Sequence, residues 1–474
     1  MNRYKKLIAN SGMVALGNFG SKLVVYFLIR FYTAYLTPDM YSTADLITQT
    51  AKLLRPFIAL SISEAIFRFA LDKNEDKKQV FSAGIYTYLV GSLILIPVVL
   101  VLWAFGLFEG YIYLLVLYVL AANIHGICTM YIRSKDHYKF FAIQGIINTA
   151  TMAGLNILFL AGFGMGIEGY VLSGVIADVV TTIIVVLKEK LWQDIVVPSK
   201  LNKATLKKML KYSIPIIPTH VIWWVTNVSD RYMVSYFSGD TENGLYSVAY
   251  KIPSLLVLVC SIFIQAWNFS SVSEENEEER RSFFSTVFSA YSAVQFLGSS
   301  FIIIFVDILV KILFDPSYHT AALFIPTLVV ATAFSSLVTF QGSVYTVNKK
   351  SMKLLYTSII AALANIVLNF VLIPESLFGI KMLGLGAIGA AIATFLSYFL
   401  VFAVRVVNIK KDFPFDMKLG VVFVNTLCVG AQCVIATLRP EGYILYQLPF
   451  VAIIFVMNFK PLLTAVKKVL FRNK

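Results

Sequence analysis

Seven basic residues lie inside stretches of sequence that are otherwise apolar, and their side chains are the ones best placed to do chemistry. A charged side chain near the centre of a bilayer costs about 2.5–3.5 kcal/mol on insertion scales. Near a helix end the cost falls, because a long side chain can extend its charge to the interface. So costly a set predicts a wet cavity lined with positive charge; the seven are Lys22, Arg30, Lys52, Arg55, Arg68, Arg231 and Lys251.

The excess of cations over acids in these stretches predicts an anionic ligand. Lys52 and Arg55 are three residues apart and share one helix face, and the only carboxylates of that helix are Asp45 and Glu64. Arginine suits phosphate because its planar guanidinium donates two parallel hydrogen bonds. An alternative is that these side chains only extend their charges to the membrane interface, above all Arg30 and Arg231, which lie near the outer ends of their helices. The predicted substrate-binding residues are Lys22, Arg30, Lys52, Arg55, Arg231 and Lys251.

Glu64 and Arg68 are read differently, because they lie four residues apart on one helix. That spacing predicts a structural ion pair between them. The four histidines have no metal-ligand spacing, and Cys128, Cys260, Cys428 and Cys433 all fall in apolar stretches. Neither a disulfide framework nor a resident metal or cofactor is therefore expected.

The composition requires a membrane protein. Of the 474 residues, 58% are hydrophobic and 14% charged, whereas soluble domains carry about 25% charged residues. A soluble enzyme, a nucleic-acid binder and a secreted module are all poor interpretations, despite the net charge of +14. We expect an all-α integral membrane fold with about fourteen spans, over 7–36, 43–70, 80–104, 111–132, 139–162, 168–188, 213–237, 243–270, 283–312, 320–347, 354–373, 384–407, 418–438 and 443–458.

The distribution of Lys and Arg predicts the orientation. If the N-terminus is cytoplasmic, thirty of the 40 basic residues fall in inner segments and three fall in outer ones. The outer three are Lys311, Lys381 and Arg439. Positive charge marks the cytoplasmic side of membrane proteins, so we expect both termini inside the cell.

An internal repeat predicts the domain organisation. The segment 30–37 aligns with 231–238, and Tyr41-Ser42-Thr43-Ala44 aligns with Tyr246-Ser247-Val248-Ala249. The copies begin six spans apart, so they have the same orientation and would form parallel lobes around a central cavity. Residues 200–211 place apolar residues at helical spacing against a lysine face, which is typical of an interfacial helix. We expect a six-helix lobe (1–190), a linker helix (191–212), a second six-helix lobe (213–410) and two additional helices with a basic tail (411–474).

Several short motifs resemble a known family. They are Leu36-Thr37-Pro38-Asp39-Met40-Tyr41, Glu64-Ala65-Ile66-Phe67-Arg68, Asp230-Arg231-Tyr232-Met233, the segment 244–253 and Gln265-Ala266-Trp267. In this order they resemble the Wzx-type polysaccharide transporters of the multidrug/oligosaccharidyl-lipid/polysaccharide exporter superfamily, over about residues 1–410. The chain departs from the family at Ser42 or Thr43, where one glycine is usual.

The resemblance implies a flippase that exports an undecaprenyl-diphosphate-linked oligosaccharide from the inner to the outer leaflet of a bacterial plasma (inner) membrane. Similar peptidoglycan-precursor flippases use basic residues in helices one, two and eight, which Lys22, Arg30, Lys52 or Arg55, and Lys251 match by position. Those relatives also hold a cation between helices seven and eleven. The matching residues here are Asp230, Asn365 and Asn369, which would hold a coupling Na⁺ or H⁺.

Other functions stay open at this point. A peptidoglycan-precursor flippase and an ion-coupled multidrug antiporter are alternatives on the same fold, although an antiporter of cations would want acids where the first span has Lys22 and Arg30. An enzyme is not expected, because the chain has neither an acidic metal motif nor a large external loop. The expected partners are the lipid-linked oligosaccharide, membrane lipids, a polysaccharide polymerase and glycosyltransferases, and nucleic acid is not expected.

Overall fold

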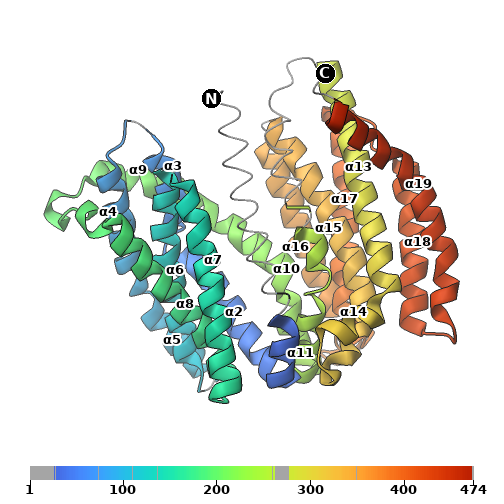
Figure 1. The fold of residues 1–474 in the computed structure, drawn as a ribbon, viewed down its shortest axis with the longest axis horizontal. Helices are drawn as coiled ribbons and strands as arrows, with labels where there is room; N and C mark the ends of the chain where they lie inside the picture. Colours follow the sequence, from blue (N-terminus) through green and yellow to red (C-terminus); the bar gives the residue numbers. More distant parts are fainter. Residues whose placement is uncertain are drawn as a thin grey trace. The chain divides into compact units, whose positions relative to one another are not determined.

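The computed structural model describes residues 26, 28–72, 74–108, 110–135, 137–258, 260–261, 277–348 and 350–471. This part of the chain is almost entirely helical (Figure 1) and divides into two compact units, Met1–Trp224 and Val225–Lys474. Ten helices among the described residues are long and apolar enough to cross a membrane. The expected all-α membrane fold is thus confirmed. The count of fourteen stays a prediction, because most of the first span lies outside the described residues.

The first unit is a bundle whose helices run side by side (Figure 1). Its core lies where α6 packs against α2, α3 and α8, and Tyr131 and Ile132 of α6 are fully buried there. The opposite surfaces are apolar yet exposed, as expected of a lipid-facing bundle; Trp103 of α5, for example, is 72% exposed. The elements are α2 (Pro38–Ile58), α3 (Ile62–Ala70), α4 (Lys77–Ser92), α5 (Leu95–Ala104), α6 (Ile112–Ser134), α7 (Tyr138–Asn156), η1 (Ile157–Gly162), α8 (Gly166–Glu189), η2 (Leu191–Asp194), η3 (Pro198–Lys200), α9 (Lys203–Ser213) and η4 (Ile214–Ile216).

The second predicted span is broken, which corrects the expectation of one helix over 43–70. Helix α2 ends at Ile58 and α3 begins at Ile62. The N–H of Ser61 donates to the carbonyl of Pro56 (3.0 Å) and that of Leu60 to Phe57 (3.4 Å), which is the hydrogen-bond pattern of a Schellman cap. Leu60 has φ 47°, where glycine is usual, because a side chain strains the left-handed conformation. Strain of this kind concentrates at functional sites.

Helix α9 begins at an Asn202 cap whose side chain accepts from the N–H groups of Ala204 and Thr205, as a polar N-cap should. The predicted lysine-faced helix is therefore present. Its apolar face packs against α3 and α4, and Met209 is fully buried there. Helix α9 thus contributes to the core of the first unit.

The second unit is built around α15, which lies largely buried among α13, α16, α17 and α18. Helices α18 and α19 pack against each other and against α13. A hairpin between α16 and α17 turns through Phe378 and Gly379, both at positive φ, as the favoured two-residue turns require. The elements are α11 (Asp240–Ala249), α13 (Glu277–Ile304), α14 (Val306–Leu313), η5 (Pro316–Leu323), α15 (Ile325–Val347), α16 (Ser351–Leu372), β1 (Ser376–Leu377), β2 (Ile380–Lys381), α17 (Gly386–Asp412), α18 (Leu419–Leu438) and α19 (Tyr443–Phe471). They follow α10 (Ile217–Ser238), within whose sequence the division between the units falls, after Trp224. The predicted boundaries at 190, 212 and 410 stay predictions.

Candidate functional site

The break between α2 and α3 opens onto a polar cavity within the first unit. Its volume is about 240 Å³, and it is bounded by the last turns of α2, the start of α3, the middle of α6 and the start of α10. The lining includes two cationic side chains and one carboxylate. The lining residues are Lys52, Arg55, Pro56, Ala59, Ser61, Ser63, Glu64, Asn123, Gly126, Met130 and His220.

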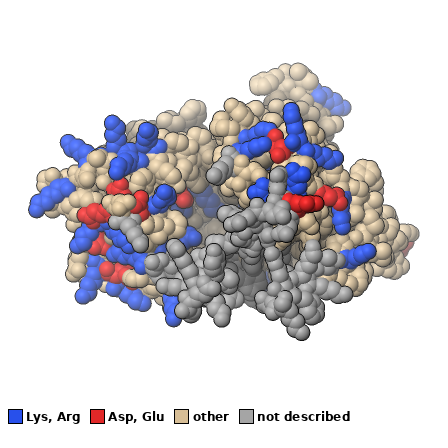
Figure 2. Space-filling view, turned by 90° about the horizontal axis from the view of Figure 1, so that it is seen from above, with Lys and Arg blue, Asp and Glu red and all other residues tan. Residues whose placement is uncertain are grey.

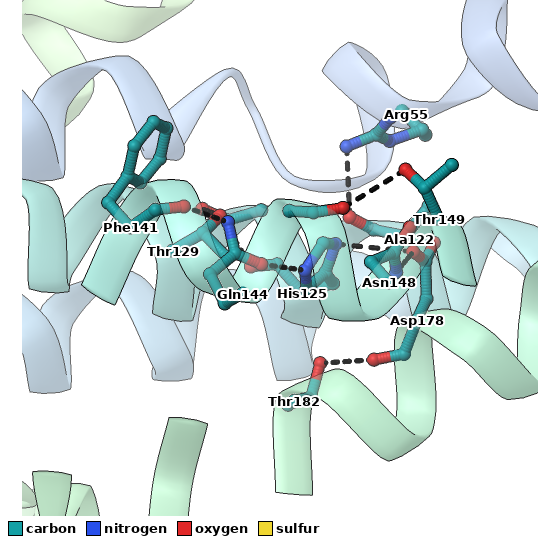
Figure 3. A network of polar contacts seen from close by, with 12 residues as sticks. Arg55, Ala122, His125, Thr129, Phe141, Gln144, Asn148, Thr149, Asp178 and Thr182 are labelled. Atoms are coloured by element: carbon teal, nitrogen blue, oxygen red, sulfur yellow. Dashed lines mark hydrogen bonds and ion pairs between the residues drawn. The ribbon is translucent and has the colours of Figure 1, made fainter. Parts of the chain in front are cut away.

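Arg55 is held by the backbone of the neighbouring helix (Figure 3). Its Nη2 donates to the carbonyl oxygen of Ala122 in α6 at 2.9 Å. Gly126, one turn further along α6, leaves room for this contact, because a Cβ there would lie 3.2 Å from Nη2. The Nε of Arg55 is buried and has no hydrogen-bond partner in the described part of the chain. The guanidinium is therefore anchored to α6 by one hydrogen bond, and one of its donors is not used within the described part of the chain.

Lys52 lies one turn before Arg55, on the same face of α2. Its side chain is exposed, and Nζ donates to Oε1 of Gln49 at 3.3 Å. The indole N–H of Trp224 donates to the Gln49 carbonyl at 2.9 Å, which joins the start of α10 to this turn of α2. The structure thus brings together Lys52 and Arg55, as their spacing predicts, and an ammonium beside a guanidinium favours an anion with several oxygens.

The other predicted cations are placed as follows. Arg30 is exposed and is not among the lining residues of this cavity. Arg231 and Lys251 belong to the second unit. Arg231 is buried, with its guanidinium carbon 5.0 Å from the centre of the Tyr250 ring, and Lys251 is half-buried. Lys22 lies outside the described residues.

The ion pair expected between Glu64 and Arg68 is not formed among the described residues, where the ion pairs involve other partners. Both side chains are exposed, and Glu64 lines the cavity. The carboxylate sits in the first turn of α3, where the positive end of the helix dipole favours negative charge without a cationic side chain.

The three residues predicted to hold a cation lie in one buried network of the second unit. Asn369 Nδ2 donates to Asn365 Oδ1 (3.0 Å), and Asn365 Nδ2 donates to Thr394 Oγ1 (3.4 Å). Thr394 in turn donates to Oδ2 of Asp230 (3.4 Å), which also accepts from the hydroxyl of Tyr246 (2.6 Å). Asn369 Oδ1 is buried without a hydrogen-bond partner in the described part of the chain. The network therefore offers a carboxylate and an unused amide oxygen.

Arg405 shows that a buried guanidinium is not by itself a binding site. In α17 it is 2% exposed, and it donates to the Val338 carbonyl (2.6 Å), to Thr357 Oγ1 (2.9 Å) and to Ser358 Oγ (3.3 Å). Its Nη1 also adjoins a glycine, Gly342, four residues after Val338. Sequence reasoning missed this burial, and the position of Arg405 inside an apolar run was the available signal.

Sequence reasoning also missed His125 and Asp178. They form an ion pair between α6 and α8, with Nδ1 and Oδ1 3.2 Å apart. No short-range spacing signals this pair, because the two residues lie on different helices. Among the described residues no cluster of three or more His, Cys, Asp or Glu could hold a metal ion.

Solved structures of two membrane transporters share this fold. A lipid II flippase, MurJ, in an inward closed conformation shares the fold with a TM-score of 0.65 at 13% identity, over 97% of this chain and 99% of that chain. An inward-facing multidrug resistance MATE family transporter of the MOP superfamily aligns with a TM-score of 0.64 at 12% identity, over 83% of this chain and 95% of that chain. At these identities the similarity shows the fold.

The sequence itself gives the family. Residues 7–268 match the family of polysaccharide biosynthesis proteins, which is more than half of the chain. The chain belongs to this family and is a multi-pass membrane protein. Among curated proteins, no sequence matches it.

Proposed function

We propose that the protein is a flippase that moves an undecaprenyl-diphosphate-linked oligosaccharide, such as a capsule or O-antigen unit, from the inner to the outer leaflet of the bacterial plasma membrane. The observation that carries the proposal is the cavity at the break between α2 and α3, where Lys52 and the anchored guanidinium of Arg55 face one space. Membership of the polysaccharide biosynthesis family supports the class of substrate. The function proposed is transport, not enzymatic conversion.

In the proposed cycle the diphosphate head enters from the cytoplasm and the polyprenyl tail remains in lipid. Lys52 and Arg55, with the other predicted cations Lys22, Arg30, Arg231 and Lys251, offset the cost of taking the diphosphate out of water. The inside-negative membrane potential favours outward movement of an anion by about 2.3 kcal/mol per charge per 100 mV. Inward movement of Na⁺ or H⁺ then resets the empty carrier.

We infer that the Asp230 network is the site for that coupling cation. Support comes from the buried carboxylate and the unused Oδ1 of Asn369. If Na⁺ binds there, replacing K⁺ by Na⁺ should raise the thermal midpoint of the purified wild type and not that of Asn369→Ala. An equal effect of Na⁺ on both proteins would contradict a Na⁺ site.

The experiment that tests the proposed function uses cells in which the gene is deleted and then restored as variants. We expect the deletion strain to accumulate a lipid-linked glycan on the cytoplasmic leaflet, and the wild type to clear it. Lys52→Gln with Arg55→Gln should leave membrane insertion intact and clear the glycan at least about tenfold more slowly. Full clearance by this double variant would refute the cavity assignment.

A matched control removes the same charge elsewhere. Lys207 and Lys211 are exposed on α9, so Lys207→Gln with Lys211→Gln also lowers the net charge by two. This control should clear the glycan as the wild type does. If it fails equally, the loss of transport reflects overall charge.

Two other functions remain candidates. The fold similarity to a lipid II flippase favours a peptidoglycan precursor as the second candidate, and the glycan that accumulates in the deletion strain separates the two. The similarity to multidrug transporters favours an ion-coupled multidrug antiporter, which would bind organic cations. Binding of a cationic dye in the cavity would support the antiporter function. Binding of a diphosphate lipid there would support the proposed flippase function.

A further inference from the structure

A polar cluster lies between three helices of the first unit, beside the cavity (Figure 3). His125 of α6 faces Asp178 of α8, with Nδ1 and Oδ1 3.2 Å apart and each side chain 18% exposed. Asn148 of α7 donates from Nδ2 to the same carboxylate oxygen at 2.9 Å. Histidine and aspartate inside a membrane bundle are costly, so a function is the default expectation for them.

The other ring nitrogen of His125 also faces an acceptor. Its Nε2 lies 3.1 Å from Oε1 of Gln144 in α7. The Nε2 of Gln144 donates to the carbonyl of Phe141 at 3.0 Å. In this orientation the amide of Gln144 turns its oxygen toward the histidine and its nitrogen toward that carbonyl. His125 therefore lies between two acceptors, one on α7 and one on α8.

Whether both contacts of His125 are favourable depends on the protonation state of its imidazole ring. A neutral imidazole has one N–H and one lone pair, whereas the imidazolium donates from both nitrogens. Both contacts are favourable only when His125 is protonated and Asp178 is ionised. After loss of the proton, a lone pair faces an oxygen either at Gln144 or at Asp178. One of the two interhelical contacts must then weaken.

The cluster adjoins the cavity through α6. Ala122, whose carbonyl binds Arg55, and Gly126, which lines the cavity, lie within one turn of His125. The Tyr118 hydroxyl interacts electrostatically with both Asp178 and Arg55. A change of charge at the pair therefore occurs within one helical turn of the Ala122 carbonyl that holds the guanidinium.

The surroundings of the pair contain few other charges. Tyr118 of α6 interacts electrostatically with Asp178, and Arg55 of α2 donates to the Ala122 carbonyl three residues before His125. Helix α7 faces the pair with the neutral amides of Gln144 and Asn148. In the described parts of α3, α4 and α5, no charged side chain hydrogen-bonds or ion-pairs with either residue. Protonation of His125 is thus the change that decides the net charge here.

We propose that His125 and Asp178 form an intramembrane proton site, and that its occupancy sets how tightly the Arg55 cavity binds an anion. With the proton bound, the pair has no net charge. Without it, the Asp178 carboxylate is uncompensated and opposes an anion near Arg55. The inference rests on the proposed function for the identity of the anion, and it makes proton binding and diphosphate binding mutually favourable.

The first test measures the protonation state of His125 directly, in the wild-type protein in liposomes. The chain has four histidines, so ¹⁵N-histidine labelling with solid-state NMR gives few signals, and His125→Gln identifies the one in question. We expect the His125 signal to change from imidazolium to neutral as the pH is raised from 5 to 8, the range in which histidine side chains change charge. A signal that stays neutral, or stays charged, throughout this range would overturn the proton site.

The second test reads the linkage, with undecaprenyl diphosphate as the probe. We expect the wild type to bind it about fivefold more tightly at pH 6 than at pH 8, beyond the change seen for His125→Gln. His137→Gln is the control, because His137 forms a similar pair with Glu189 (2.9 Å) but is 47% exposed; it should behave as the wild type. Identical pH dependence in the wild type and His125→Gln would overturn the linkage.

The two proposals can fail separately. If the probe binds through Lys52 and Arg55 but its affinity depends on pH equally in the wild type and in His125→Gln, only the proposed linkage to His125 fails. If the probe does not bind at any pH, the proposed function and the linkage both fail, and the NMR titration alone then decides whether the proton site exists.

Discussion

At the residue scale, the chain contains two arginines with nearly the same local geometry and different roles. Arg55 donates to the carbonyl four residues before Gly126, and Arg405 donates to the carbonyl four residues before Gly342. Arg405 has three acceptors and is buried, whereas Arg55 lines the cavity with one acceptor for its guanidinium in the described part of the chain, the Ala122 carbonyl. The environment, and not the residue type, separates a structural guanidinium from one available to a ligand.

This comparison gives a paired prediction. Arg405→Gln should lower the free energy of unfolding by about 3 kcal/mol, because it leaves buried acceptors without donors. Arg55→Gln should change stability by less than about 1 kcal/mol, because it removes one partly exposed hydrogen bond, and should slow export instead. Thermal unfolding in detergent and glycan clearance in cells measure the two effects. Loss of stability in Arg55→Gln equal to that in Arg405→Gln would mean that Arg55 is structural.

At the element scale, the break between α2 and α3 depends on a close approach by α4. A Cβ added at Gly91 would overlap the carbonyl oxygen of Ile58, the last residue of α2. We therefore expect Gly91→Ala to separate the two helices and lower the thermal midpoint, at a cost of at least about 2 kcal/mol.

The control for this prediction lies in α7. Gly154 has open space where a Cβ would be, so Gly154→Ala should be neutral or stabilise by up to about 1 kcal/mol through helix propensity. If Gly91→Ala is as well tolerated as Gly154→Ala, the contact between α4 and the end of α2 does not set the position of the break.

The elements also show what the sequence could predict. The apolar runs predicted the helices, and the three-residue spacing predicted that Lys52 and Arg55 share a face, because both are local properties of the chain. The cap at Leu60 was missed, because a Schellman cap normally shows itself by glycine, and Pro56 inside the helix was the only local signal. The pairing of His125 with Asp178 depends on which helices pack together. That is a long-range property, which the local patterns of a single sequence do not specify.

At the scale of the whole molecule, the direction of transport depends on how the protein is oriented in the membrane. Figure 2, seen from the end at which α9 lies in Figure 1, shows many more Lys and Arg than Asp and Glu. The hairpin of β1 and β2 carries Lys381, one of three basic residues in the predicted outer segments. By the positive-inside rule, the α9 end should be cytoplasmic.

Cysteine labelling in whole cells tests this orientation. We expect Lys381→Cys to react with a membrane-impermeant maleimide in intact cells, and Lys207→Cys to react only after permeabilisation. Both positions are exposed, and of the native cysteines Cys128, Cys260 and Cys428 are buried, so the background should be low. The reverse labelling pattern would invert the topology and, with it, the proposed direction of transport.

The central claim is that Lys52 and Arg55 bind a diphosphate head during its passage across the membrane. Its most direct measurement is the rate at which purified protein in liposomes transfers a fluorescent undecaprenyl-diphosphate sugar between leaflets, read by a quencher added outside. We predict that Lys52→Gln with Arg55→Gln lowers this rate at least about tenfold while Lys207→Gln with Lys211→Gln leaves it unchanged. Equal rates for the two double variants would contradict the account.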